Sequence, residues 1–247
     1  MGRATQRSIE ILELIAQRKG NWTHAEIARQ LGIPKSTLTD LLRDLVRQQY
    51  LELDRGAEYC IGPRVLVLSR AYLGRIDLVA RSRDILALLS ESADEAASIA
   101  VRQGNEIVAV AQECPTRPLV AAMMVGDRAP MVATATGKSI LAHLDAATIA
   151  EIVRSGNAGV ADTRKPRDTA ALMAELAGIR AGALATNDKE WMEDISAVAL
   201  PVLTARGPIA SIAIAAPTAR MTREWLIAVE PRLRQAAGEL TLRMGGA

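Results

Sequence analysis

The chain has 247 residues, of which 49% are hydrophobic and 23% charged, a balance typical of one or two globular domains. It contains no run of the roughly 18 to 20 apolar residues that span a membrane, and its start lacks the apolar segment of a signal peptide, so we expect a cytoplasmic protein without a membrane partner. The net charge of +2 does not by itself indicate nucleic-acid binding, although residues 1–70 hold 11 Lys and Arg against 8 Asp and Glu.

The first predicted element is an amphipathic helix over residues 8–18. Its expected apolar side comprises Ile9, Leu12, Ile15 and Ala16. Arg3 and Arg7 precede this helix, either as a basic arm against DNA phosphates or as an ordinary frayed terminus. Gly20 and Asn21 are expected to end it, and Thr23 to cap the helix that follows.

Residues 23–45 are predicted to form two short helices joined by a turn at Gly32 and Ile33, with Pro34 at the first position of the second helix. Leucines at i, i+3, i+4 and i+7 give that second helix one apolar stripe, formed by Leu38, Leu41, Leu42 and Leu45. Its opposite face carries Lys35, Ser36, Thr37, Thr39, Asp40 and Arg43. The pattern is typical of a helix-turn-helix whose second helix enters the DNA major groove; the alternative is an αα-hairpin with a solvated outer face.

Two short alternating runs, residues 49–53 and 58–61, flank a turn that contains Gly56, which predicts a β-hairpin. After three helices, this hairpin is the expected wing of a winged helix-turn-helix. Arg55 at its tip can reach a phosphate or the minor groove. Residues 63–77 are predicted to hold a further amphipathic helix that ends near Gly74 and either links two domains or packs on its own domain.

From residue 78 onward the pattern predicts an α+β domain built on an antiparallel sheet. The expected strands are residues 97–103, 106–114, 119–125, 183–187, 197–203 and 209–216, with a loop at 126–130. The expected helices are residues 78–93, 133–144, 146–154, 168–179 and 222–244, with Asp145 and Asp168 as caps.

Cys60 and Cys114 lie in predicted strands without a Cys or His partner at metal-ligand spacing, and His24 and His143 are equally isolated. This favours two buried free thiols over a zinc site or a disulfide, so we expect no metal and no cofactor.

Four segments in order carry a resemblance to a known family: "AEIARQLGIPKSTLTDLLRDLV…YLELD", "YCIGPRVLVLSRAYL", "VGDRAPMVATATGKSILA" and "DISAVALPVL…GPIASIAIAAPTARMT". The chain resembles the IclR family of bacterial transcriptional regulators from end to end. The resemblance implies a winged helix-turn-helix DNA-binding domain over residues 1–62, a linker helix over 63–77 and a GAF-like effector-binding and oligomerisation domain over 78–247. It also implies a homodimer or dimer of dimers that binds double-stranded operator DNA and a small organic, often aromatic, acid.

Carried onto this sequence, the resemblance implies a set of DNA-contacting positions. These are Thr23, Lys35, Ser36, Thr37, Thr39, Asp40, Arg43 and Arg55. Asp40 departs from the family pattern, in which a basic residue is common. An acid there either accepts from a base amino group such as cytosine N4 or pairs with Arg43 on the same helix.

The resemblance also implies an effector pocket where a helix start meets the loop before a strand. Its expected residues are Met124, Thr134, Ala135, Thr136, Asn187, Asp188, Glu190 and Ala197. Backbone N–H groups at a helix start suit a carboxylate. Asn187 stands where an acid is usual and Ala197 where Cys or Ser is common, which argues against the ligands of relatives that sense small oxoacids. Four apolar side chains either line a pocket for a larger or aromatic effector or simply fill the core: Met123, Met124, Trp191 and Met192.

Two other patterns are weaker. The sequence Gly137, Lys138, Ser139 resembles the end of a phosphate-binding loop, but the glycine needed five residues earlier is Val132, which favours a structural Lys138. Asp188 and Glu190 lack a third ligand for a metal. We therefore expect no enzyme but an effector-responsive DNA-binding regulator, a repressor of catabolic genes. The alternatives are an enzyme acting on a small acid in residues 78–247 and a DNA-binding protein without an effector.

Overall fold

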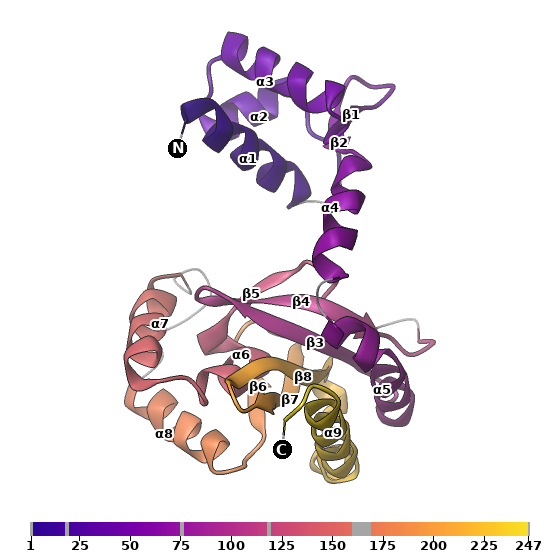
Figure 1. Cartoon of the computed structure of the whole chain (residues 1–247), viewed down its shortest axis with the longest axis vertical. Coiled ribbons are helices and arrows are strands. Elements are labelled where there is room, and N and C mark those ends of the chain that lie inside the picture. Colours follow the sequence, from indigo (N-terminus) through magenta and orange to yellow (C-terminus); the bar gives the residue numbers. More distant parts are fainter. Residues whose placement is uncertain (1, 18–19, 75–76, 118–119, 160–168, 247) are drawn as a thin grey trace. The chain divides into compact units, whose positions relative to one another are not determined.

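The computed structural model describes residues 2–17, 20–74, 77–117, 120–159 and 169–246. The chain divides into two compact units, Met1–Arg75 and Ile76–Ala247 (Figure 1). Within the described ranges, no helix is both long enough and apolar enough to cross a bilayer.

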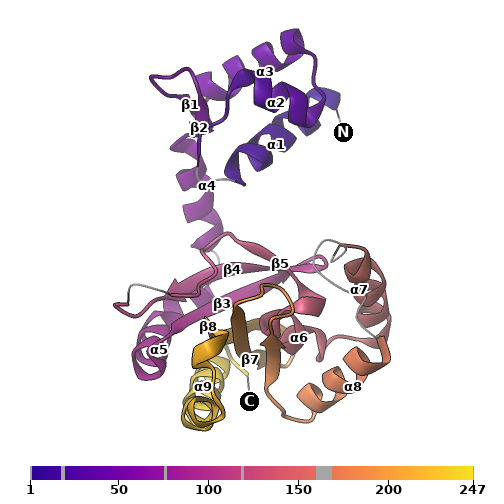
Figure 2. The ribbon, with the colours of Figure 1, turned by 180° about the vertical axis from the view of Figure 1, so that it is seen from behind.

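The first unit is a winged helix-turn-helix, as predicted. Its elements are α1 (Arg3–Ala16), α2 (His24–Leu31), α3 (Lys35–Arg47), β1 (Leu51–Leu53), β2 (Tyr59–Ile61) and α4 (Arg64–Leu73). Figure 2 shows α1, α2 and α3 packed together, and their shared core includes the fully buried Ile11, Ile27 and Leu42. The strands β1 and β2 form the antiparallel wing, and Trp22 bridges to Tyr59 beside it.

Local chemistry sets the limits of the two central helices. Thr23 and Glu26 form a reciprocal capping box that starts α2, and Gly32 ends it in the left-handed conformation with φ +62°, which glycine adopts without steric cost. Pro34 is predicted at the first position of α3 but lies at the N-cap, one residue before the helix begins. Both helices otherwise follow the sequence pattern.

The helix α1 differs from its prediction. It begins at Arg3 instead of residue 8, so Arg3 and Arg7 belong to the helix and not to an extended arm or a frayed terminus before it. The buried face is formed by Ile11, Leu14 and Ile15, whereas Ile9 and Ala16 are exposed. Apolar residues occur on several sides of this helix, so its periodicity does not specify one face. Residue 18, the predicted end, lies outside the described residues.

None of the ten residues of α4 is buried in this unit. Its exposed apolar side chains include Leu66, of which 71% is accessible, and Tyr72, of which 54% is accessible. The helix predicted to end near Gly74 is confirmed, because α4 ends at Leu73 with Gly74 as its C-cap. The next helix begins at Asp77, the last residue of the predicted linker.

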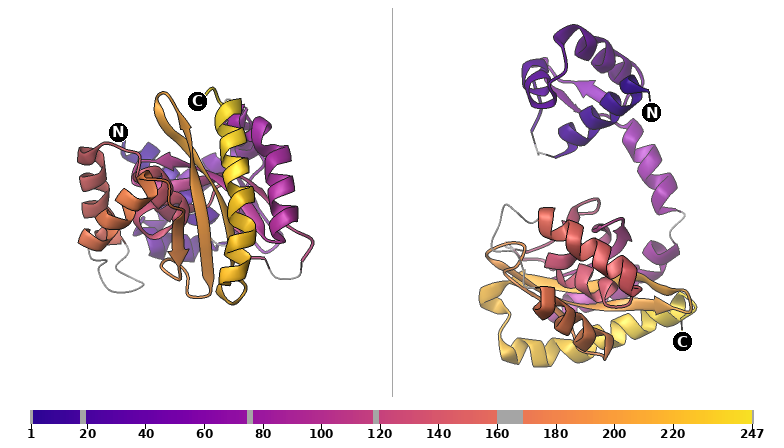
Figure 3. Two further views of the ribbon diagram at one scale, coloured as in Figure 1. Left: turned by 90° about the horizontal axis from the view of Figure 1, so that it is seen from below. Right: turned by 90° about the vertical axis from the view of Figure 1, so that its left-hand side faces the viewer.

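The second unit is built on a six-stranded antiparallel sheet in the order β5-β4-β3-β8-β7-β6. Its strands are β3 (Ala96–Gln103), β4 (Glu106–Glu113), β5 (Arg128–Pro130), β6 (Ala185–Asp188), β7 (Ile195–Thr204) and β8 (Gly207–Pro217). Its α-helices are α5 (Asp77–Ala93), α6 (Ala135–Leu141), α7 (Ala146–Gly159), α8 (Thr169–Arg180) and α9 (Arg223–Arg243), and short 3-10 turns lie at Met131–Ala133 and Thr218–Arg220. The helices α5 and α9 pack together on one face of the sheet, and α6 packs on the other (Figure 3). This confirms the predicted α+β class.

Three predictions, two for this unit and one for the cysteines of both units, differ from the structure. The strand expected over 119–125 does not occur in its described part: residues 120–124 have no regular structure, and the strand is β5, within the expected loop. Residue 119 lies outside the described residues. An apolar run alone does not distinguish a strand from a covering loop. The helix expected from 133 to 144 begins after its cap, Thr134, and ends at Leu141. Neither thiol is buried, since Cys60 is half-buried and Cys114 exposed, although both are free.

Of the two aspartates predicted to cap helices, Asp145 is confirmed. Asp145 Oδ1 accepts a 2.9 Å hydrogen bond from the Thr148 amide at the start of α7, which confirms its role. That helix continues beyond the predicted residue 154 to Gly159. Asp168, the other expected cap, lies outside the described residues.

Candidate functional site

The polar face of α3 is solvent-exposed, whereas its leucine stripe is buried except for the half-buried Leu41. Leu38 and Leu42 are completely inaccessible. Most of the predicted DNA-contacting side chains on this helix are exposed: Lys35, Ser36, Thr39, Asp40 and Arg43; Thr37 is half-buried. The α3 N-terminus has no side-chain cap and no acidic residue in its first turn, so its backbone N–H groups and Lys35 present positive potential to an anion such as a phosphate.

Three side chains on this face, those of Thr39, Asp40 and Arg43, have local partners. The Thr39 hydroxyl donates to the Lys35 carbonyl oxygen at 2.8 Å, and His24 Nε2 lies 3.0 Å from the same hydroxyl. This leaves the Thr39 methyl group as its free contact surface, and it brings His24, which the sequence did not single out, onto the edge of the face. Asp40 Oδ1 accepts from Arg43 Nη2 at 2.7 Å between exposed side chains, the intrahelical alternative considered above.

The wing and the start of α2 are held by carboxylates. Thr23 hydrogen-bonds Glu26 through both its amide and its hydroxyl, which commits Thr23 to the capping box. At the wing tip, Asp54 Oδ1 accepts from the amides of Gly56 and Glu58, both at 2.9 Å. The Glu58 amide, with smaller contributions from the Asn21 side chain and the Gly56 amide, lowers the pKa of Asp54.

This carboxylate closes the wing turn and leaves Arg55 exposed at its tip. Arg55 is the single cation of that turn, flanked by Asp54 and Glu58. The wing turn therefore carries little net positive charge. On α3, Arg43 and Arg47 are paired with Asp40 and Asp44, which leaves Lys35 as the cation at the start of the helix.

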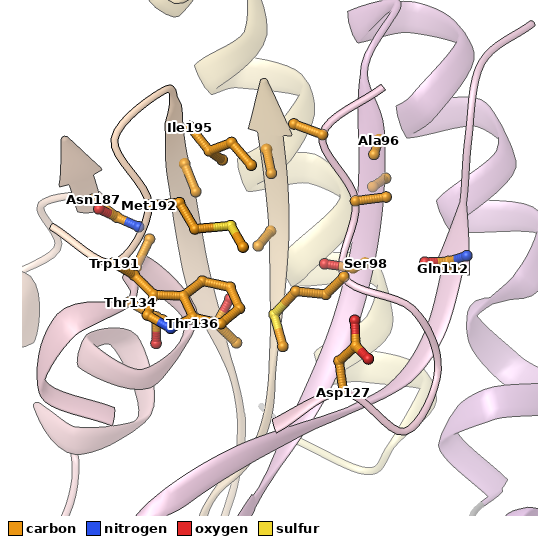
Figure 4. A pocket seen from close by; sticks show the side chains of 18 residues that line it. Ala96, Ser98, Gln112, Asp127, Thr134, Thr136, Asn187, Trp191, Met192 and Ile195 are labelled. Carbon is orange, nitrogen blue, oxygen red and sulfur yellow. The ribbon is translucent and has the colours of Figure 1, made fainter. Parts of the chain in front are cut away.

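The second unit contains a pocket of about 90 Å³ on the α6 face of its sheet (Figure 4). That exceeds several times the roughly 10–15 Å³ that one water molecule needs. Cross-strand register explains the hollow. Asn187, Ala197, Ala215 and Ala96 are successive partners across β6, β7, β8 and β3, so they share one face of the sheet. Three neighbouring methyl side chains leave space where larger residues would fill it.

The pocket is mostly apolar, with few polar groups. Eight alanines line it: Ala96, Ala97, Ala121, Ala122, Ala135, Ala197, Ala213 and Ala215. The larger apolar lining side chains are Met123, Trp191, Met192 and Ile195. The polar lining residues are Ser98, Gln112, Asp127, Thr134, Thr136 and Asn187. Among these described lining residues there is one carboxylate, that of Asp127, and no Lys, Arg or His.

One polar wall lies at the start of α6. Thr134 caps this helix, because its hydroxyl accepts from the Gly137 amide at 3.1 Å and donates to the Pro130 carbonyl oxygen at 3.0 Å. Thr136 has no side-chain partner among the described residues. Asn187 is 4% exposed, its Oδ1 accepts from the Glu190 amide at 2.8 Å, and its amide nitrogen is directed toward the cavity (Figure 4).

The structure brings together five of the eight residues predicted for the pocket, namely Thr134, Ala135, Thr136, Asn187 and Ala197. The other three are Met124, Asp188 and Glu190, and none of them lines it. Asp188 follows Asn187 in β6 and so points to the opposite face, where its Oδ1 accepts from Ser196. Met124 is 54% exposed. Sequence reasoning missed Ser98, Gln112 and Asp127. The pairing of β3 with β4 brings Ser98 and Gln112 together, and Asp127 lies in the loop just before β5.

Glu190 is held by a buried lysine instead. Lys138 on α6 is 0% exposed, and its Nζ lies 2.8 Å from Glu190 Oε1 and 2.6 Å from Glu175 Oε1 on α8. Lys138 thus connects α6, α8 and the loop that carries Trp191, and it has a structural role as expected. Among the described residues, no group of three or more His, Cys, Asp and Glu is arranged to hold a metal ion.

A winged helix-turn-helix followed by an α+β domain defines a DNA-binding transcriptional regulator. Residues 4–55 match the IclR helix-turn-helix domain and residues 70–242 match the C-terminal domain of the bacterial transcriptional regulator IclR. The chain therefore belongs to the IclR family of bacterial transcriptional regulators.

Individual relatives extend over nearly the whole chain. The probable transcriptional regulator SauR of Cupriavidus necator is 30% identical over 96% of this chain and 95% of its own length. The Pca regulon regulatory protein of Pseudomonas putida is 27% identical over 89% of this chain and 76% of its own. An IclR homologue from Microbacterium hydrocarbonoxydans, solved as a complex with 4-hydroxybenzoate, has a TM-score of 0.81 at 20% identity and covers 98% of this chain and all of its own.

Proposed function

We propose that this regulator binds operator DNA through α3 and that a small organic acid in the α6-side pocket changes the affinity for that DNA. The observation that carries the proposal is the pocket itself: an apolar cavity, hollowed by alanines, with hydrogen-bonding groups at its edge. Specific ligand sites have this composition, in which apolar walls supply affinity and a few polar groups fix orientation.

On the DNA side, the proposed contacts are the exposed residues of α3 together with Arg55. Lys35, Ser36 and the open helix N-terminus suit phosphates, whereas Arg43 and the Thr39 methyl group suit base edges. Because Arg43 pairs with the exposed Asp40, Arg43 has to leave Asp40 before it can bind a guanine base or a phosphate.

On the ligand side, the acid's carboxylate is proposed to lie against the α6 start. Neutral donors are available there: N–H groups of the first helical turn, the Thr136 hydroxyl and the Asn187 amide. A flat alanine floor opposite Trp191 and Met192 suits an aromatic ring. The 4-hydroxybenzoate complex of the M. hydrocarbonoxydans homologue supports an aromatic acid.

We further propose that the chain represses catabolic genes in the cytoplasm and acts as a homodimer or dimer of dimers. The apolar side chains that α4 leaves exposed in its own unit, including Leu66 and Tyr72, support association. Two-fold symmetric DNA sites are typical of dimeric helix-turn-helix proteins. Light scattering on the full chain measures this oligomeric state directly.

The test is a binding experiment with the full chain. A DNA fragment selected by the protein from a random library is titrated, by fluorescence anisotropy, with and without a panel of aromatic and aliphatic acids. We expect at least one acid to change DNA affinity by about 5- to 150-fold, the usual range for coupled sites. If every acid that binds leaves the DNA affinity unchanged, the protein is a constitutive DNA binder. Turnover of an acid would support the enzyme alternative.

A further inference from the structure

The pocket has a second polar wall, which the proposed carboxylate site does not use. Ser98, Gln112 and Asp127 form this wall, and Figure 4 shows them across the cavity from Thr136 and Asn187. Ser98 and Gln112 are direct cross-strand partners on β3 and β4. An elongated ligand whose carboxylate lies at the α6 start therefore directs its other end toward this wall.

Gln112 contributes an acceptor that has no partner. Its Nε2 donates to Met124 Sδ at 3.4 Å. A thioether sulfur accepts but cannot donate, so this contact identifies the other amide atom, Oε1, as the oxygen. Oε1 is buried and has no hydrogen-bond partner among the described residues. Buried acceptors are normally satisfied, so this atom requires a donor that the described part of the protein does not supply.

Asp127 adds charge to the same wall. Its Oδ2 accepts from the Met124 amide at 2.7 Å, so the side chains of Asp127 and Gln112 both contact Met124. Asp127 is solvent-exposed, so its carboxylate lies at the open edge of the wall. An ionised aspartate offers acceptors only, and no cation lies among the described lining residues. The wall therefore favours a hydrogen-bond donor and disfavours a second carboxylate.

We propose that this wall selects the effector: a small monocarboxylic acid that carries a hydroxyl or amino group at the end opposite its carboxylate. The inference rests on the proposed function, because it takes the carboxylate end as bound near Thr136. A donor at the far end pairs with Gln112 Oε1 and with the Asp127 carboxylate. An acid with an apolar far end leaves Gln112 unpaired, and a dicarboxylic acid places its second charge against Asp127.

Matched acids test this with the full chain by isothermal titration calorimetry. Benzoate lacks the far group, 4-hydroxybenzoate can donate, 4-methoxybenzoate can only accept, and terephthalate carries a second charge. We expect 4-hydroxybenzoate to bind about 10- to 100-fold more tightly than benzoate or 4-methoxybenzoate, and terephthalate to bind most weakly. Hexanoate, 6-hydroxyhexanoate and 6-aminohexanoate repeat the comparison on an aliphatic chain and separate hydroxyl from ammonium recognition.

The variant Gln112→Met keeps the side-chain length and removes the acceptor. We expect the preference for 4-hydroxybenzoate over benzoate to fall toward one in this variant, and to persist in Gln103→Met, which changes an exposed glutamine of β3 outside the pocket. Equal wild-type affinities within both ligand series would overturn this inference and leave the proposed function standing. If none of these acids binds the wild-type protein, the inference and the proposed acid effector both fail.

Discussion

The buried ion cluster around Lys138 gives a quantitative prediction for the variant Lys138→Met. Methionine keeps the length of the side chain but removes its charge. The Lys138 side chain is 0% exposed, whereas those of its partners Glu175 and Glu190 are each 25% exposed. The variant therefore removes the Lys138 ammonium from both carboxylates and places a buried apolar group beside them.

Removing one partner of a buried ion pair costs about 3–5 kcal/mol, because the remaining charge stays desolvated. Because both glutamates are partly exposed, water can solvate part of their charge. We therefore expect the free energy of unfolding to fall by about 2–3 kcal/mol, at or slightly below the lower end of that range. For a unit of this size, each kcal/mol lowers Tm by roughly 2–4 °C, which gives a decrease of about 4–12 °C.

The assay is thermal unfolding of the full chain, followed by circular dichroism. Lys189→Met is the matched control, since it makes the same change at an exposed lysine beside Glu190 and should move Tm by less than about 1 °C. The triple variant Lys138→Met, Glu175→Gln, Glu190→Gln should recover part of the loss, because it also removes the two carboxylate charges that Lys138 neutralises. A Lys138→Met protein as stable as wild type, or no recovery in the triple variant, would refute this electrostatic account.

Three further predictions concern the other parts of the molecule. If Lys35 contacts a phosphate, Lys35→Ala weakens DNA binding and reduces the slope of log affinity against log salt by about one, measured by anisotropy; an unchanged slope removes Lys35 from the contacts. Ala215→Leu fills the pocket floor, so calorimetry should show loss of acid binding while ligand-free DNA binding persists; tight acid binding would place the ligand elsewhere. In Gly137→Ala a Cβ would lie 2.3 Å from the Met131 Cα, so Tm should fall. Gly178 lies in a helix with open space around an added Cβ, so Gly178→Ala should increase the free energy of unfolding by up to about 1 kcal/mol and raise Tm.

The sequence predicted best where local chemistry decides the structure. The helix-turn-helix follows from the Thr23 cap, the Gly32 stop and the leucine spacing of α3, all of which act within a few residues. The face of α1 was mispredicted because Ile9 and Ile11 are both apolar, and only packing against the other helices decides which one is buried.

The pocket was predicted in part for the same reason. Thr134 and Thr136 lie at a helix start that the sequence indicates, and Asn187 is in the strand expected to face it. Gln112 reaches the pocket through pairing of β4 with β3, and that register cannot be obtained from local sequence. Glu190 was predicted to line the pocket from an equally local sequence pattern. It instead binds the buried Lys138, which lies 52 residues earlier in the chain.

The cross-strand alanines on the pocket face of the sheet have a consequence for how ligand preference can change among relatives of this protein. Main-chain hydrogen bonds between β3, β8 and β7 hold the strands in place whatever side chain occupies a position, so Ala96, Ala197 and Ala215 can each be enlarged or polarised without altering the scaffold. One added methylene shifts hydrophobic transfer energy by about 0.8 kcal/mol, nearly a fourfold change in affinity. New chemical preferences can therefore arise by single nucleotide changes in a receptor whose architecture stays constant.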